Sequence, residues 1–295
     1  MSDHRRARGE VVRARPSRRK DLRERLDALV ATFDHAHHRA HDPVELVHAY
    51  ADDDDREVVA LLAASLAFGN VVSIRRSVRR VLDVIDPSPA RTVERAGEAT
   101  LRRRLDGFVH RTWRGEHVAR LLHRAGTLRR DEGSLGDAFA TRLEAADGDL
   151  REGLADFADA LRGPRPDRSM AHLVPDPRKG SACKRLLLFL RWMVRPADGV
   201  DLGLWSARVA TSSLVIPVDT HVQRIGRNLR LTDRRTASWR TAEEITASLR
   251  GLDPADPVKY DFALCHLGVS RRCPSRRDPA VCEACALRSV CRHWR

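Results

Sequence analysis

Four of the six cysteines lie within the last 23 residues, and their spacing suits metal ligands. Cys273, Cys282, Cys285 and Cys291 are separated by eight, two and five residues in the run CPSRRDPAVCEACALRSVC. Four thiolates so close in sequence repel one another unless a metal or cluster shares their charge. Structural zinc usually binds two CxxC-like pairs or a cysteine/histidine mixture, whereas one loop with unequal gaps suits a 4Fe–4S cluster. We therefore predict a metal centre: a 4Fe–4S cluster is favoured, zinc is the alternative, and unliganded thiols are the remaining interpretation.

Asp219 stands in the run VIPVDTHVQRIGR, between an apolar turn and the start of an expected helix. Val222, Ile225 and Leu229 follow it at helical spacing, so Asp219 occupies an N-cap position. A lone aspartate before a helix is usually only a cap. An ionised carboxylate can also stabilise positive charge that develops on a substrate, and the two roles are compatible.

Lys184 is a candidate nucleophile. Only four of the 54 basic residues are lysines, and lysine, unlike arginine, can lose its proton and act as an amine nucleophile. The run PDPRKGSACKRLLLFLRWMVR predicts a turn at Gly180, a cap at Ser181 and a buried helix with Lys184 in its first turn. Exposed amides at such a turn bind phosphate, so Lys179, Gly180 and Ser181 are predicted DNA contacts. The alternative for Lys184 is a phosphate-contacting or solvated lysine.

These motifs resemble those of the helix-hairpin-helix DNA glycosylase superfamily. The cysteine spacing is similar to that of the cluster loop that closes endonuclease III and related adenine glycosylases, with a longer first gap, and FALCHLGVSRRC resembles the helix before that loop. VIPVDTHVQRI resembles the run that carries the superfamily's catalytic aspartate, which gives Asp219 that role. The resemblance implies that the cluster is mainly structural and positions Arg276 and Arg277 on the DNA backbone.

The resemblance is weaker around Lys184. Bifunctional members of the superfamily use a lysine here as a Schiff-base nucleophile, and the resemblance implies that role for Lys184. It precedes Asp219 by 35 residues, a longer spacing than in endonuclease III, and no GVG turn stands before it. The spacing is nearer to that of archaeal 8-oxoguanine glycosylases, whose lysine begins a helix similar to KRLLLFLRWM. Residues 43 to 295 as a whole resemble a bacterial family of unknown function.

Two segments offer side chains for a base pocket. LLAASLAFGN aligns loosely with the segment that reaches into the gap left by a flipped base, which makes Phe68 and Asn70 candidates. GFVHRTW supplies Phe108, His110, Arg111 and Trp113, whose stacking and donor groups suit a purine. Each of these residues is alternatively a core or surface residue.

The elements that must position these residues are predicted to be helices. Residues 21–33, 56–68 and 73–85 carry apolar side chains at three- and four-residue spacing, and the second run is apolar on nearly all sides, as a buried central helix is. Helical periodicity continues through residues 116–163, and no series of alternating strands occurs. We predict an all-α fold with about a dozen helices, in which Trp192 and Trp205 belong to the core.

The predicted organisation has three parts. A disordered basic arm spans residues 1–18, a helical glycosylase-like domain of two subdomains spans 19–272 with its hairpin at about 174–194, and a four-cysteine cluster loop spans 273–295. The histidine-rich run at 35–42 is predicted to be solvated surface rather than a metal site.

Composition favours a nucleic-acid partner. Lys and Arg number 54 against 41 Asp and Glu, which gives a formal net charge of +13. Such a balance favours phosphate-rich partners, although a merely solvated basic surface is the alternative. Because neither a long apolar run nor a signal-peptide pattern occurs, we expect a soluble, cytoplasmic, nucleoid-associated monomer that makes no membrane contact, with cysteines that bind metal or stay free.

The expected function is a DNA repair glycosylase, a hydrolase of N-glycosyl bonds that flips a damaged nucleotide out of double-stranded DNA, with AP-lyase activity if Lys184 is the nucleophile. An oxidised purine is the favoured lesion. A non-catalytic DNA-binding module with a structural four-cysteine metal centre is the alternative. An RNA-acting protein with the same basic surface is a third class.

Overall fold

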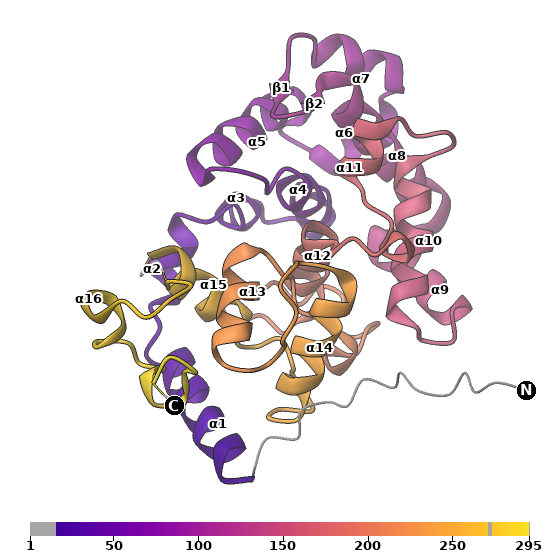
Figure 1. The fold of residues 1–295 in the computed structure, drawn as a ribbon. Coiled ribbons are helices and arrows are strands. Elements are labelled where there is room, and N and C mark those ends of the chain that lie inside the picture. The colour runs from indigo at the N-terminus through magenta and orange to yellow at the C-terminus, as the bar shows by residue number, and fades with distance from the viewer. Residues whose placement is uncertain (1–15, 271–272, 295) are drawn as a thin grey trace, which may run out of the picture.

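The computed structural model describes residues 16–270 and 273–294, and helices dominate them (Figure 1). The α-helices are α1 (Pro16–Ala31), α2 (His35–Ala40), α3 (Glu45–His48), α4 (Asp53–Ser65), α5 (Val71–Ile85), α6 (Pro89–Arg95), α7 (Glu98–Arg104), α8 (Gly115–Glu132), α9 (Leu135–Ala145), α10 (Leu150–Arg162), α11 (Arg168–Leu173), α12 (Lys184–Val194), α13 (Thr220–Asn228), α14 (Trp239–Arg250), α15 (Asp261–Ser270) and α16 (Pro279–Cys282). Strands β1 (Val109–His110) and β2 (Trp113–Arg114) form a short antiparallel pair, and η1 (Pro177–Lys179), η2 (Thr211–Ser213) and η3 (Arg288–Val290) are 3-10 turns.

Helix α4 is the centre of the molecule. The Asp52 carboxylate caps its N-terminus by accepting hydrogen bonds from two backbone amides, and every residue from Glu57 to Ser65 is buried. Helix α12 packs along α4 and is buried over most of its length, including Trp192. The prediction of a buried central helix is therefore confirmed for residues 57–65, whereas the helix ends before Phe68, which is 40% exposed.

A second group of helices covers one end of α4. The predicted apolar face of α5 is confirmed, because Ile74, Val78, Val81, Leu82 and Ile85 are all buried. Helices α6 and α7 both pack against α8, and the β1–β2 pair lies beside α5 (Figure 1).

One buried carboxylate joins α4 to three distant segments. Glu57 accepts hydrogen bonds from the indole Nε1 of Trp205 at 2.6 Å and from the backbone amides of Leu135 and Gly136 at 2.9 and 3.1 Å. The Arg129 guanidinium lies 2.7 Å from the same carboxylate. The amides belong to the first turn of α9, where a helix favours negative charge. Glu57 therefore fixes α8, α9 and the Trp205 segment around the core.

A second buried ion network positions α15. Arg191, on α12, forms ion pairs with Asp261 at 2.7 Å and Asp201 at 3.0 Å, and all three side chains are buried. Because Asp261 is the first residue of α15, this pair sets where that helix begins relative to α12. Further along α15, a Cβ on Gly268 would lie 2.7 Å from the His221 Cβ, so α15 and α13 approach closely at this point.

The all-α prediction is confirmed in the described residues, which form sixteen α-helices rather than about a dozen. The additional helices are short, as α3 and α16 are with four residues each. The predicted arm extended to residue 18, but α1 begins at Pro16; residues 1–15 lie outside the described residues. Within the described ranges, no helix is both long and apolar enough to cross a membrane.

Candidate active site

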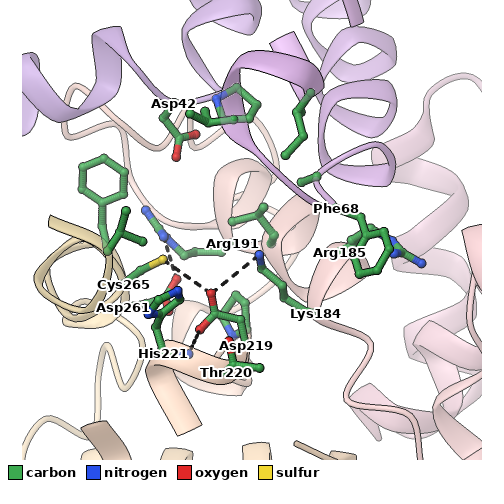
Figure 2. A pocket seen from close by; sticks show the side chains of 18 of the residues that line it. Asp42, Phe68, Lys184, Arg185, Arg191, Asp219, Thr220, His221, Asp261 and Cys265 are labelled. Carbon is green, nitrogen blue, oxygen red and sulfur yellow. Dashed lines mark hydrogen bonds and ion pairs between the residues drawn. The ribbon is translucent and has the colours of Figure 1, made fainter. Parts of the chain in front are cut away.

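A cavity of about 730 Å³ lies where α2, the end of α4, the turn before α12, the start of α13 and α15 meet. Figure 2 shows side chains from these segments pointing toward one another across it. Asp219 and Lys184, which are 35 residues apart in sequence, both line this cavity. The structure therefore brings the two predicted catalytic residues into one site.

Asp219 uses its two carboxylate oxygens differently. Oδ1 accepts hydrogen bonds from the backbone amides of His221 at 2.8 Å and Val222 at 2.7 Å, so the predicted N-cap of α13 is confirmed. Oδ2 lies 3.9 Å from the Lys184 Nζ and 4.0 Å from the Cys265 Sγ. The Asp219 side chain is 17% exposed. Capping therefore fixes the orientation of the carboxylate and leaves one oxygen facing the cavity.

Lys184 is the first residue of α12. Its side chain and that of Cys265 approach Asp219 from opposite sides (Figure 2). Its side chain is 35% exposed, so the amine is accessible from the cavity. The prediction that Ser181 caps this helix is wrong: the N-cap residue is Cys183, which has a positive φ of 45°, and no side chain caps α12. The Ser181 hydroxyl instead accepts a hydrogen bond from the Cys183 amide within the turn.

Cys265 is a cavity residue that the sequence analysis did not single out. Burial, with the negative charge of Asp219 adding to it, raises the pKa of the Cys265 thiol. The thiol is therefore neutral at physiological pH and can act as a weak hydrogen-bond donor to Asp219. Its position four residues after Asp261 on α15 was the available signal, since two polar residues at helical spacing interrupt an apolar helix.

The far end of the cavity is aromatic and basic. Phe68 is 40% exposed and lines the cavity beside His172, whose ring centroid lies 5.6 Å from that of Phe68. Buried Trp113 backs both rings. The guanidinium groups of Arg111 and Arg185 lie 5.4 and 5.8 Å from the Phe68 ring centroid.

Of the six predicted base-pocket residues, the structure places Phe68 on the cavity wall, Arg111 over its ring and fully buried Trp113 against the same ring, but it does not place the other three at the cavity. Asn70 caps α5 by accepting a hydrogen bond from the Val72 amide. His110 is 2% exposed and lies between the Ser77 hydroxyl and the Leu66 carbonyl. Phe108 is 3% exposed and borders a separate cavity of about 680 Å³. Asn70 is thus engaged in capping, and burial withholds His110 and Phe108 from this site.

The histidine-rich run was predicted to be solvated surface, and the structure adds a second property. His37, His38 and His41 line the cavity together with His266 of α15. The His38 ring stacks on Phe33 with centroids 4.4 Å apart and lies 4.6 Å from His266. Partial burial and the neighbouring histidines lower the pKa of His38, so this imidazole is neutral at physiological pH.

The predicted phosphate contacts occupy the turn before α12. Lys179 ends η1, Gly180 follows with a positive φ of 80°, and Ser181 lies at the cavity edge. All three residues are exposed. Arg178 is different, because it forms ion pairs with Asp176, Asp156 and Asp159.

The four C-terminal cysteines fold into a loop beside α13. The Asn228 side-chain amide lies 3.6 Å from the Cys273 Sγ, and the Arg292 amide donates to the Asn228 carbonyl at 2.8 Å. Burial, with the thiols of Cys285 and Cys291 adding to it, raises the pKa of Cys273. As the side chains stand, no three His, Cys, Asp or Glu residues in the described ranges are arranged to hold a metal ion.

Arg276 and Arg277 lie on the same loop and are exposed. The Arg277 guanidinium lies 3.6 Å from the ring centroid of Trp294, and Arg288 lies over the same ring at 4.0 Å. Trp294 thus gathers basic groups on one surface of the loop. Arg288 is a member of this group that the sequence analysis did not identify.

Comparison with known proteins identifies the family of the chain. No curated protein matches it. Residues 42–270 match the model of a family described as "Protein of unknown function (DUF2400)". This match covers all the residues that line the cavity from Asp42 to Val269, and it ends before the cysteine loop. Because it also spans well over half of the sequence, the chain belongs to this family.

Proposed function

We propose that this protein is a DNA glycosylase that removes a damaged base from double-stranded DNA by nucleotide flipping. The observation that carries the proposal is the arrangement of Asp219, whose Oδ1 is held by two helix amides while Oδ2 faces Lys184 at 3.9 Å in a cavity of about 730 Å³. A carboxylate fixed beside an amine can both stabilise positive charge and accept a proton. The net charge of +13 supports a polyanionic partner.

The chemistry would begin with the flipped nucleotide in the cavity, where its sugar lies against Asp219. As the bond between C1′ and the base nitrogen breaks, positive charge develops on the sugar, and the ionised Asp219 stabilises it. Asp219 Oδ2 lies 3.9 Å from the Lys184 Nζ, so it can accept the proton that the amine must lose. The neutral amine then bonds to C1′, and the base leaves with the electron pair of the broken bond and takes up a proton from the attacking nitrogen. The C1′–O4′ bond then breaks, O4′ takes up the proton held by Asp219, and the nitrogen lone pair forms the C=N bond of the protonated Schiff base.

Strand cleavage by β-elimination would follow from that Schiff base. If Lys184 does not attack, Asp219 can instead activate a water molecule, which makes the enzyme a monofunctional glycosylase. Both routes need Asp219, whereas only the first needs Lys184.

The arrangement before Lys184 supports a helix-hairpin-helix fold. Helix α11 ends at Leu173, η1 and the left-handed Gly180 make the turn, and α12 begins at Lys184. Lys179, Gly180 and Ser181 would contact DNA phosphates through exposed amides and the lysine charge. The cavity beside this turn would receive the flipped nucleotide between two helical subdomains.

The donors around the cysteine loop support the proposal of a 4Fe–4S cluster there. Buried polar atoms without a partner among the described residues include the Nε of Arg224, which acts electrostatically on Cys273, the Ser289 hydroxyl and the His293 Nε2. Unsatisfied buried donors cost free energy, and the sulfurs of a cluster are acceptors. Cys273, Cys282, Cys285 and Cys291 would hold the cluster; zinc is the alternative metal. When bound, it would supply structure rather than reaction chemistry, fixing Arg276 and Arg277 on the DNA backbone.

Borohydride trapping tests the proposal. Purified protein would be incubated with duplexes that each carry one 8-oxoguanine, uracil, oxidised pyrimidine or abasic site, then reduced to fix any Schiff base. We expect a covalent adduct on one lesion that disappears in Lys184→Gln. The matched control is Lys20→Gln, which removes an exposed lysine on α1 and should retain the adduct.

Other outcomes decide between the remaining functions. Base release without an adduct, lost in Asp219→Asn, would establish a monofunctional glycosylase. Binding without any release, unchanged by Asp219→Asn, would favour a non-catalytic DNA-binding module, which the N-cap role of Asp219 also allows. Preference for a matched RNA duplex over DNA would contradict the choice of DNA as substrate, because A-form grooves suit nucleotide flipping poorly.

A further inference from the structure

We infer that the Phe68 end of the cavity accepts an uncharged, carbonyl-bearing base that leaves as an anion, and that it excludes positively charged bases, such as purines alkylated at N3 or N7. This inference rests on the proposed function and names the substrate class of the same site. Arg185 and Arg111 are the residues that determine the selectivity.

Arg185 differs from the other buried arginines. Five arginines are buried in the described part of the chain: Arg129, Arg162, Arg185, Arg191 and Arg195. Four of them form ion pairs with carboxylates. Arg185 has no carboxylate partner within the described ranges, and its Nε is buried without a hydrogen-bond partner. Its positive charge is therefore uncompensated by the protein.

The hydrogen bonds of Arg185 leave part of its guanidinium unused. Nη2 donates to the backbone carbonyls of His172 and Leu173, the latter at 3.3 Å. These neutral acceptors do not cancel the charge, and a buried unpaired charge costs free energy. Because Arg185 lines the cavity, a ligand with acceptor atoms or developing negative charge would supply the missing interaction.

The surroundings of Arg185 keep it charged. Its guanidinium lies 4.6 Å from the Trp113 ring centroid and 5.8 Å from that of Phe68, and aromatic faces attract cations. Burial lowers the pKa of Arg185 to about 10, which still leaves it protonated at neutral pH. Exposed Arg111 lies 5.4 Å from the Phe68 centroid. Two positive groups therefore accompany the aromatic surface on which a base would stack.

The acidic residues of the cavity lie elsewhere. Figure 2 shows Asp42, Asp219 and Asp261 on the other side of Lys184 from Phe68. Asp261 is neutralised by Arg191 at 2.7 Å. The cavity therefore has a negative end at Asp219, where positive charge develops on the sugar, and a positive end at Phe68.

This polarity matches one class of leaving group. When the C1′–N bond of an uncharged base breaks, the electron pair moves to the base nitrogen, and the base leaves as an anion that is protonated afterwards. The guanidinium groups stabilise that anion. A cationic base leaves as a neutral molecule and gains no such stabilisation, and two arginines at the Phe68 ring repel it before the bond breaks.

The test compares base release from duplexes that contain one 8-oxoguanine, uracil or 7-methylguanine, each corrected for its uncatalysed rate. We expect the faster of the first two bases to be released at least about tenfold faster than 7-methylguanine, given unit charges a few ångströms apart in a partly buried site. Asp219→Asn protein should bind the 7-methylguanine duplex more weakly, by a similar factor, than the duplex that carries the preferred of the other two bases. This measurement needs no turnover.

Three variants test whether the arginines cause the selectivity. The release ratio is the corrected rate for the faster of 8-oxoguanine and uracil divided by that for 7-methylguanine. Arg185→Gln and Arg111→Gln should each lower this release ratio, whereas Arg240→Gln, which removes an exposed charge on α14, should leave it unchanged. A structural defect alone would slow the release of all bases equally. Since Arg185 is buried, its variant can misfold, and exposed Arg111 then decides the question.

A ratio of one or less, or a ratio that Arg111→Gln and any folded Arg185→Gln protein leave unchanged, would overturn this inference while the glycosylase proposal stands. Failure to release any base from the three duplexes, together with no adduct on any lesion in the trapping experiment, would overturn the proposed function and this inference with it.

Discussion

Replacing Asp219 with asparagine would separate the capping role of this residue from its proposed catalytic role. The Asp219 Oδ1 accepts from two helix amides, while Oδ2 lies 3.9 Å from the Lys184 Nζ. Asparagine retains a carbonyl oxygen in the position of Oδ1 and is as good an N-cap as aspartate. It replaces Oδ2 with an amide group, which can neither accept a proton from Lys184 nor stabilise a positive sugar.

The magnitudes of the two effects differ enough to be distinguished. Loss of the charge at the N-terminus of α13 should cost only about 0.3–1 kcal/mol of unfolding free energy, because the capping hydrogen bonds persist. Loss of a preorganised electrostatic group should lower the rate of base release ~10²- to 10³-fold, or about 2.7–4 kcal/mol. Asp219→Ala should lose about 1 kcal/mol of stability from the cap as well as the activity.

The assay would measure single-turnover base release from the duplex selected by borohydride trapping, and urea unfolding followed by circular dichroism. The expected result is that Asp219→Asn unfolds close to the wild-type urea concentration and releases base at least about a hundredfold more slowly. If the asparagine variant released base at the wild-type rate, the reasoning would be refuted and Asp219 would be a helix cap only. A loss of release that scales with a loss of folded protein would refute it as well.

Three further predictions concern the structure around the site. Glu57→Ala should lower the unfolding free energy by about 3–5 kcal/mol, because it leaves the buried Trp205 indole and the Leu135 and Gly136 amides without their acceptor and removes one of the three carboxylates of Arg129; a normal urea midpoint would contradict this. Burial lowers the pKa of His110, so the unfolded chain takes up the proton first, and stability should fall as pH drops below about 6.5; His110→Gln should flatten this dependence in urea titrations at pH 5 to 8. Gly268→Val should slow base release by more than its loss of folded protein explains, since its Cβ would lie 2.7 Å from the His221 Cβ and displace α15 from α13. An unchanged release rate would show that base release does not depend on this contact.

The long helices could be predicted from sequence because their periodicity is strong. The apolar faces of α4 and α5 are buried as predicted, and Trp192 and Trp205 belong to the core. Short helices such as α3 and α16 carry too few residues to show a period, and helices of this length depend on tertiary packing. Helix α1 begins at Pro16, two residues before the predicted end of the arm, and its first turn contains two arginines and little that is apolar.

The candidate site was predictable only where one residue stood before a helix. Asp219 and Lys184 could be found because each lies at the start of a helical run whose sequence resembles a glycosylase motif. Cys265 could not be placed beside Asp219, because the two are 46 residues apart and the contact depends on how α15 packs against α13. The missing carboxylate of Arg185 was likewise invisible, since a sequence shows which charges exist but not which of them pair.

The cap role of Asp219 is a condition for the proposed chemistry rather than a competing explanation. An aspartate side chain free to rotate would place its charge toward Lys184 only part of the time, and would lose rotational entropy in the transition state. The two amides of α13 hold the carboxylate before substrate arrives, so this ordering is included in the folding of the helix. Cys265 and Lys184 then remain as the described neighbours of Oδ2, and only Lys184 carries a charge. A carboxylate that caps the N-terminus of a helix and faces an amine is therefore oriented for the proposed reaction by the same hydrogen bonds that stabilise the fold.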